Sequence, residues 1–207
     1  MKKQVLNLVC GVMAFIVLSA CSSSPSVNRV DADTQVDLSG EWNDTDVRQA
    51  CESLVADCLK NPRVAPFIDQ YVAENKGALP TIIVGRFSNK SSEHIDMGLI
   101  SKNMEIALIN SGRLEFVAGG ETRQELRAER QDQLANASDN TTPALGNETA
   151  AIFMLTGTVE SIVRKVDNVT SRYYSVSAEL TNIETTARWW MGQHEIKKVI
   201  QQPRSRL

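Results

Sequence analysis

The C-terminal part of the sequence limits the fold most strongly, because it predicts three long strands in succession. We expect them at Phe153–Val166, Arg172–Ile183 and Arg188–Ile200. In the middle strand apolar residues alternate with others, as is typical of a strand that buries one face: Tyr174, Val176, Ala178 and Leu180. Turn-forming residues separate the strands, at Asp167-Asn168 and at Glu184-Thr185-Thr186. The three strands are therefore expected to pair as an antiparallel meander.

The preceding part of the chain alternates helices with shorter strands. A first helix, with Asp44 as its N-cap, carries apolar residues at helical spacing as far as Cys58. A second helix, capped by Asn61, stops at Gly77. The elements expected next are a strand at Thr81–Phe87, a helix at Ile95–Ser111, a strand at Leu114–Val117 and a helix at Glu121–Leu134. The sequence thus predicts an α/β fold with a single mixed β-sheet of about five strands flanked by helices.

The first 20 residues predict a signal peptide rather than a part of the fold. Lys2 and Lys3 form a positively charged start, which the apolar stretch Leu8–Leu18 follows. This stretch is shorter than the ~20 residues that a membrane-spanning helix needs. Its end resembles the lipobox of bacterial lipoproteins, formed here by Leu18, Ser19, Ala20 and Cys21. The resemblance implies cleavage before Cys21 and acylation of that cysteine, whereas the alternative is an ordinary secretory signal with a cysteine nearby.

The residues after the cleavage site predict a tethered domain. Position 22 is Ser rather than Asp, which in lipoprotein sorting implies the periplasmic face of the outer membrane more often than the inner membrane. Residues 21–37 are polar and have no helical or strand period, so we expect a flexible linker. Residues 38–207 are long enough for one globular domain.

Charge and residue inventory argue against an enzyme. Cleavage removes Lys2 and Lys3 from 22 basic residues and leaves all 25 acidic ones, so the mature chain carries a formal charge of about −5 and gives no reason to expect nucleic acid. The two histidines, His94 and His194, lie in unlike settings, and no Cys/His set has zinc spacing. We therefore predict no catalytic residues, no metal, no cofactor and no small-molecule substrate.

Two cysteines remain in the predicted domain, Cys51 and Cys58. Seven residues of continuous helix separate their Cα atoms by roughly 10 Å, whereas a disulfide needs less than about 7 Å. They can form a disulfide only if the helix breaks before Cys58. The alternative is that both are small buried apolar residues on one helix face.

The helix expected at Glu121–Leu134 has its charges sorted by sign. Glu121, Glu125 and Glu129 fall in one sector together with Asp132. The arginines lie on the opposite side, at Arg123, Arg127 and Arg130. One interpretation is that the arginine stems cover apolar surface, their heads reach acids elsewhere, and the acidic side faces water. The other is that one of the two faces docks a partner protein.

Several segments of the chain resemble the LpoB family of lipoproteins, which activate penicillin-binding proteins. They occur in the same order as in the family, at Val36–Asp46, Ile83–Asp96, Ser111–Val117 and Met154–Val159. The last two strands also resemble the family's ending, with its Trp-bearing strand, so that the likeness covers roughly Val36 to Ile200. The resemblance implies a fold like the N-terminal domain of TolB, which is also related to the curli secretion lipoprotein CsgG.

The same resemblance implies a role without catalysis, in which the domain binds a bifunctional penicillin-binding protein and stimulates its synthesis of peptidoglycan. The linker is shorter than the long Pro-rich linker of the best-known members, and the family's partner-binding residues match no motif in this sequence. The alternative function is that of a CsgG-like assembly or structural lipoprotein of the envelope, which predicts ring-like oligomers.

Overall fold

The structure, a computed structural model, describes residues 27–31, 34–37, 39–138, 140–144 and 146–202. The chain divides into two units, Met1–Thr34 and Gln35–Leu207, and the fold below is that of the second. The predicted signal peptide, the lipobox and Cys21 lie outside the described residues. The processing of this end of the chain therefore stays a prediction.

A five-stranded mixed sheet forms the body of the second unit, and its strands follow the order β2-β1-β3-β4-β5. Their bounds are Thr81–Lys90 for β1, Glu115–Phe116 for β2, Phe153–Val166 for β3, Val169–Asn182 for β4 and Arg188–Gln201 for β5. Strand β1 pairs in parallel with β2 and β3, whereas β3, β4 and β5 form an antiparallel meander. The mixed sheet and the meander predicted from the sequence are confirmed.

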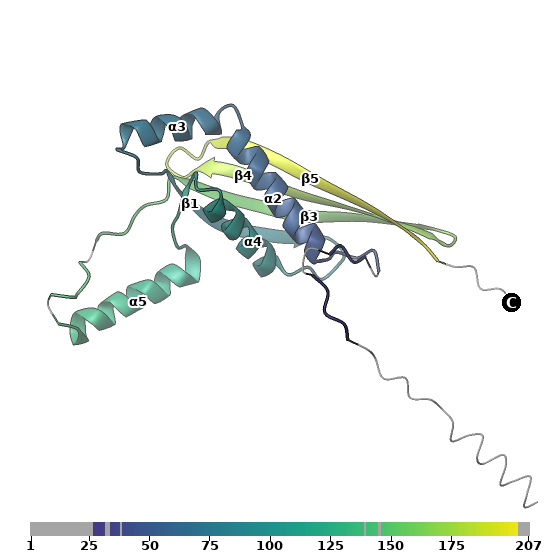
Figure 1. Cartoon of the computed structure of the whole chain (residues 1–207), viewed down its shortest axis with the longest axis horizontal. Coiled ribbons are helices and arrows are strands. Elements are labelled where there is room, and N and C mark those ends of the chain that lie inside the picture. Colours follow the sequence, from purple (N-terminus) through teal and green to yellow (C-terminus); the bar gives the residue numbers. More distant parts are fainter. Residues whose placement is uncertain (1–26, 32–33, 38, 139, 145, 203–207) are drawn as a thin grey trace, which may run out of the picture. The chain divides into compact units, whose positions relative to one another are not determined.

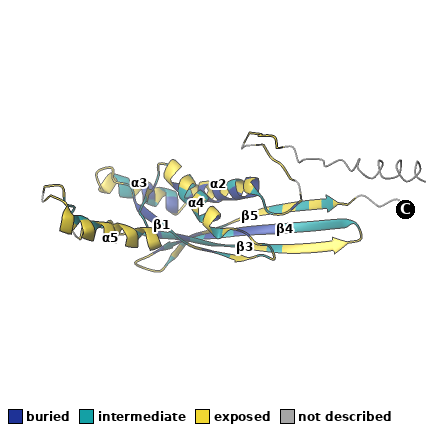
Figure 2. Cartoon of the chain, turned by 90° about the horizontal axis from the view of Figure 1, so that it is seen from below, coloured by how far each residue is buried: buried dark blue, intermediate teal, exposed yellow. Residues whose placement is uncertain are grey.

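Three helices cover one face of this sheet (Figures 1 and 2). They are α2 at Asp44–Lys60, α3 at Val64–Glu74 and α4 at Met97–Asn110. The core between helices and sheet is apolar, and its fully buried side chains include Ile68, Ile100, Met104, Leu108, Phe153, Leu155, Val176 and Leu180. Every second residue of β4 from Tyr174 to Asn182 is buried, as the sequence pattern predicts, and Ser175 is buried as well.

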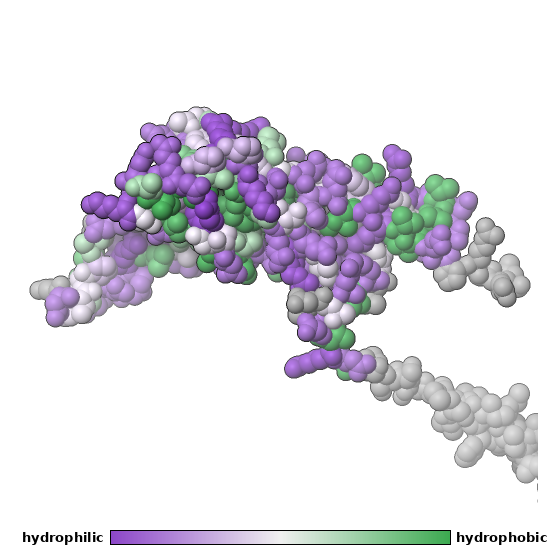
Figure 3. Space-filling model, turned by 45° about the horizontal axis from the view of Figure 1, so that its top comes forward, coloured by the Kyte–Doolittle hydropathy of each residue, from purple (hydrophilic) through white to green (hydrophobic). Residues whose placement is uncertain are grey.

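The long strands continue past the part of the sheet that the helices cover. In β3 the buried residues all lie in the first half, between Phe153 and Val159. Apolar side chains further along are open to solvent, at Ile162, Val166 and Val199. The space-filling view shows apolar residues exposed among polar ones toward the end of the strands (Figure 3). This end of the meander therefore adds apolar surface to the outside of the protein.

The starts of the first two helices differ from the prediction. The N-cap of α2 is Asn43 rather than Asp44, because Asn43 and Asp46 form a reciprocal capping box. The Oδ1 atom of Asn43 accepts from the Asp46 amide, and Oδ2 of Asp46 accepts from the Asn43 amide, both at 3.0 Å. Asn61 caps the end of α2 instead of the start of α3, which begins at Val64 without a side-chain cap.

Cys51 and Cys58 are free thiols, so the disulfide considered from the sequence is not formed. Helix α2 runs through both positions without a break, which keeps the two residues two turns apart. Each side chain is 1% exposed. Burial raises the pKa of both thiols to about 12, so that they stay protonated at neutral pH. They act as small apolar residues between α2 and its neighbours.

Candidate functional site

Helix α5, Gly120–Asn136, carries the charge pattern that the sequence singled out. It leaves the sheet after β2 and lies apart from the helices that cover the sheet (Figure 1). None of its described residues is buried, and Leu126 and Leu134 are each more than two-fifths exposed. The helix is therefore positioned by polar contacts rather than by a packed apolar face.

The arginine side of α5 converges on one carboxylate from the loop that follows the helix. Arg127 donates from Nε to Oε1 of Glu148 and from Nη2 to Oε2, both at 2.9 Å. Nη1 of Arg130 reaches the same Oε1 at 2.9 Å. Nε of Arg123 donates to the backbone oxygen of Ala118 at 2.9 Å. We call these three arginines, with the hollow beside them, the arginine pocket.

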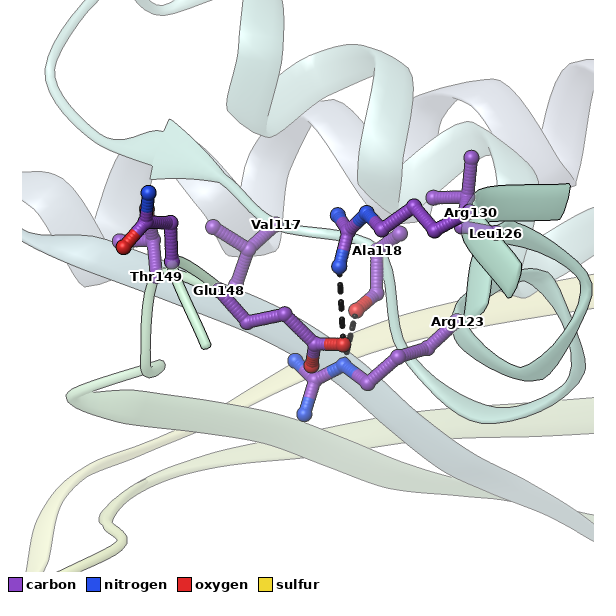
Figure 4. Close-up of a pocket in the computed structure, with 8 residues that line it drawn as sticks. Val117, Ala118, Arg123, Leu126, Arg130, Glu148 and Thr149 are labelled. Atoms are coloured by element: carbon purple, nitrogen blue, oxygen red, sulfur yellow. Dashed lines mark hydrogen bonds and ion pairs between the residues drawn. The ribbon is translucent and has the colours of Figure 1, made fainter. Parts of the chain in front are cut away.

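The hollow of the arginine pocket has a volume of about 200 Å³ and lies between α5 and the segments that flank it, with Arg127 just outside its lining (Figure 4). Its lining is mixed, with charged residues beside apolar ones: Val117, Ala118, Arg123, Leu126, Arg130, Asn147, Glu148 and Thr149. The hydrogen bond from Arg127 and the positive charges of the three arginines hold the pKa of Glu148 below its ordinary value. Glu148 is therefore ionised at neutral pH, which suits it to bind guanidinium groups.

The opposite side of α5 is acidic and faces solvent. Glu121, Glu125 and Glu129 are all exposed, and none of them forms an ion pair with another described residue. The structure thus brings together the arginines of the predicted docking face and leaves its acids in water. This arrangement agrees with arginine heads that reach an acid elsewhere. The acid itself, Glu148, lies in a loop without a sequence signal.

A second polar cluster, which the sequence did not predict, lies where the chain enters the domain. Glu93, in the loop after β1, is the acceptor at its centre. The hydroxyl of Tyr174 donates to Oε1 of Glu93 at 2.6 Å, Nη1 of Arg172 pairs with the same oxygen, and the Trp42 amide donates to Oε2 at 3.2 Å. The Trp42 ring packs edge-on against the Tyr174 ring, with centroids 5.4 Å apart. The cluster therefore holds Trp42 against Tyr174 of β4.

Lys198 of β5 binds the same N-terminal segment of the domain at residues on both sides of Trp42. Its Nζ atom bonds Oδ1 of Asp37 and Oδ2 of Asp46, both at 2.7 Å, and the backbone oxygen of Glu41 at 3.0 Å. Only 10% of the lysine side chain is exposed. Burial alone would lower the pKa of Lys198, but the two carboxylates outweigh it, so the pKa is raised and the charge is kept. Asp37 and residues 39–46 therefore form a strap pinned to the sheet.

The Glu93 cluster gives a testable pH dependence. Burial acts to raise the pKa of Glu93, but the hydrogen bonds from Tyr174, Trp42 and Arg172 outweigh it and lower the pKa. A lowered pKa in the folded state adds stability above the unfolded value of about 4.3, and this stability is lost as the pH falls through the folded value. We expect Glu93→Gln to cost about 2 kcal/mol at pH 7. Its urea midpoint should also fall less steeply than that of the native chain below about pH 4.

Glu195 supplies the matched control for this measurement, because it also accepts a hydrogen bond from a tyrosine hydroxyl, at 2.7 Å from Tyr173, but is exposed. Glu195→Gln should change the free energy of unfolding at pH 7 by less than about 0.5 kcal/mol. Equal losses in the two variants at pH 7 would show that the Glu93 cluster adds no more stability than an exposed contact.

The described residues give no further arrangement suited to metal binding. No group of three or more His, Cys, Asp or Glu side chains among them is placed to hold a metal ion. His94 lies in the loop before α4 and His194 lies on β5, so the two histidines belong to separate parts of the fold. In the part of the chain that the structure describes, no helix is both long and apolar enough to cross a membrane.

Comparison with known proteins identifies the family. A sequence model described as peptidoglycan-synthase activator LpoB matches residues 46–196, which include strands β1 to β4, most of β5 and most of the helical layer. The chain belongs to the LpoB family. The family is described by the activation of a synthase and not by a reaction of its own, which agrees with the expectation of a non-enzymatic protein.

Solved LpoB structures are similar to the chain at low sequence identity. The LpoB C-terminal domain from Salmonella enterica is 18% identical over 76% of this chain and 99% of that one, with a TM-score of 0.41. The same domain from Escherichia coli is 16% identical over 74% and 99%, with a TM-score of 0.45. The NMR structure of E. coli LpoB is 15% identical over 89% and 86%, with a TM-score of 0.41. No curated protein sequence matches the chain.

Proposed function

We propose that this protein is a lipoprotein of the outer membrane that binds a bifunctional penicillin-binding protein in the periplasm and stimulates its synthesis of peptidoglycan. The observation that carries the proposal is the family match over residues 46–196. The sequence adds the lipobox at Leu18–Cys21, which supplies the membrane anchor through Cys21. Several acyl chains together give stable anchoring, at roughly 0.8 kcal/mol per buried CH₂ group.

The strap sets the length of the proposed tether. Because Lys198 holds Asp37 on the sheet, the part of the linker free to extend runs only from Cys21 to Asp37. Its contour length is at most about 55 Å. Asp37, where the domain holds the chain, can therefore lie no further than about that distance from the anchoring membrane, and any further reach toward the synthase comes from the domain itself.

The proposal is tested with the purified full chain in nonionic detergent and the bifunctional penicillin-binding proteins of the same organism. Binding and the rate of glycan polymerisation are measured while the chain is titrated. We expect saturable binding to one synthase and a faster rate that follows the binding curve. Flat curves with every synthase would contradict the proposal and favour the CsgG-like assembly alternative. The mass of the oligomers in solution would then test that alternative.

The same assay examines the acidic face of α5. A variant with Glu121, Glu125 and Glu129 all changed to Lys reverses this face. Its matched control changes three exposed acids outside α5, Glu52, Glu184 and Glu195, to Lys. If the acidic face docks the synthase, only the α5 variant loses affinity. Unchanged affinity in the α5 variant excludes the acidic face and leaves the proposed activation intact.

A further inference from the structure

We propose that the arginine pocket of α5 is a binding site for an acidic segment of a partner polypeptide, and that Glu148 is its internal occupant. In this arrangement Glu148 fills the place of a partner carboxylate and leaves when that carboxylate binds. The proposal adds the chemistry of one contact to the proposed function. It does not require the partner to be a synthase, so it is tested with a probe of its own.

The charge in the pocket is incompletely neutralised. Three guanidinium groups, those of Arg123, Arg127 and Arg130, face the single carboxylate of Glu148, and no other acidic residue lines the hollow. The charges that remain after this pairing sum to about two positive units at neutral pH. A second carboxylate beside Glu148, or two in its place, would therefore be attracted rather than repelled.

Most of the hydrogen-bond donors in the pocket are unused. A guanidinium group has five N–H donors in a planar fork. Among the described residues, Arg123 donates only from Nε, to Ala118, and Arg130 donates only from Nη1, to Glu148. Both side chains extend from α5 toward the Glu148 carboxylate (Figure 4). A planar carboxylate matches the fork in a bidentate way, which Arg127 already shows with Glu148.

The apolar part of the lining points to a polypeptide as the ligand. Val117, Ala118 and Leu126 form a wall beside the arginines, and Leu126 is 43% exposed. An acidic residue with an apolar neighbour would place its carboxylate on the arginines and cover Leu126 at the same time. The other side of α5 carries Glu121, Glu125 and Glu129 and repels acidic chains, so that the helix accepts such a segment from one side only.

Exchange of Glu148 for an outside carboxylate requires little disruption. The side chain of Arg127 is 56% exposed and that of Glu148 is 28% exposed, so water reaches the ion pair. Ion pairs that are open to solvent add little to stability. Glu148 also belongs to an irregular loop and not to a helix or strand, so its movement breaks no regular backbone hydrogen bonds. An internal acid that is easily displaced acts as a competitor.

Competition by Glu148 predicts the direction in which each substitution changes the affinity for an acidic peptide. The full chain in nonionic detergent is titrated against a fluorescent hexaglutamate peptide, and binding is followed by anisotropy at low salt. We expect the native chain to bind and Glu148→Gln to bind at least about threefold more tightly, because the internal competitor is removed while the side chain keeps its size. Arg127→Gln with Arg130→Gln should weaken binding at least about fivefold, and Arg130→Lys should weaken it less.

Glu125→Gln is the matched control, because it removes one acid from the same helix on the side away from the pocket, and it should bind within about twofold of the native chain. Helix content by circular dichroism checks that α5 persists in each variant. Weaker or equal binding by Glu148→Gln with α5 intact would overturn the proposal. So would equal binding of hexaglutamine, or binding to phosphatidylglycerol vesicles but not to the peptide. None of these outcomes bears on synthase activation, which is measured separately.

Discussion

Replacing Lys198 with methionine should lower the free energy of unfolding by about 3 kcal/mol at neutral pH. The methionine keeps most of the apolar stem but removes the charge that Asp46 faces, and the Asp46 side chain is only 5% exposed. A buried carboxylate that loses its cation is costly, whereas the intact pair adds little over an apolar contact. Asp46 also belongs to the capping box of α2, so disturbance of its side chain weakens the start of that helix.

Lys197→Met is the control for this prediction. Lys197 is the neighbouring residue on the same strand, but its side chain lies on the opposite, exposed face and forms no ion pair with a described residue. Its replacement should change the free energy of unfolding by less than about 0.5 kcal/mol. Urea titrations of both variants measure the difference. Coincident midpoints for the two variants would mean that the strap is not held by Lys198.

The sheet and its buried face follow from the sequence because they depend on local patterns. Alternation in β4 identifies Tyr174, Val176 and Leu180 as inward residues, and the structure buries all three. The turn between β3 and β4 is shorter than predicted, since Asp167 adopts a positive φ and the pairing closes at Val166 and Val169. Asn and Asp tolerate this conformation better than other residues with a side chain, so the Asp167-Asn168 signal locates the turn but not the ends of the strands.

The polar clusters could not be predicted, because their members lie far apart in the sequence. Glu93 is about 80 residues away from Arg172 and Tyr174. The sequence nevertheless carried a partial signal. Arg172 stands in phase with Tyr174 on the inward side of β4, and Lys198 stands in phase with Trp190 on β5. A cation at an inward position of a strand indicates a buried acid opposite it, although the pattern does not say which acid.

Only one part of the site on α5 could be predicted from the sequence, the part that depends on local spacing. Helical spacing separates the arginines from the acids, so both faces follow from the sequence. That the arginines meet Glu148 depends on the path of the loop after the helix, which no local pattern encodes. The close packing at Gly157 is a parallel case. A Cβ atom there would overlap the Phe87 ring of β1 and lie 2.5 Å from the backbone oxygen of Ser177 on β4, and both residues are distant from Gly157 in the sequence.

Replacing Phe153 with alanine should cost about 4 kcal/mol, the largest loss that we expect from a single change. The Phe153 ring is fully buried and belongs to an aromatic group that joins α3 to the sheet. Its centroid is 5.4 Å from that of Phe67 on α3 and 5.1 Å from that of Trp189 on β5, both edge-on. Such edge-on pairs add to the burial of the ring itself.

The cavity left by Phe153→Ala cannot close easily, because β3 is paired on both sides and Trp189 is also held by the Arg63 guanidinium, 4.4 Å from its ring centroid. Met191→Ala is the control, since Met191 is 62% exposed on β5 and should change stability by less than about 0.5 kcal/mol. A lower urea midpoint with an unchanged slope would show that α3 and the sheet unfold as one unit. An unchanged midpoint with a reduced slope would contradict this, because it would mean that α3 detaches alone while the rest of the fold is unaffected.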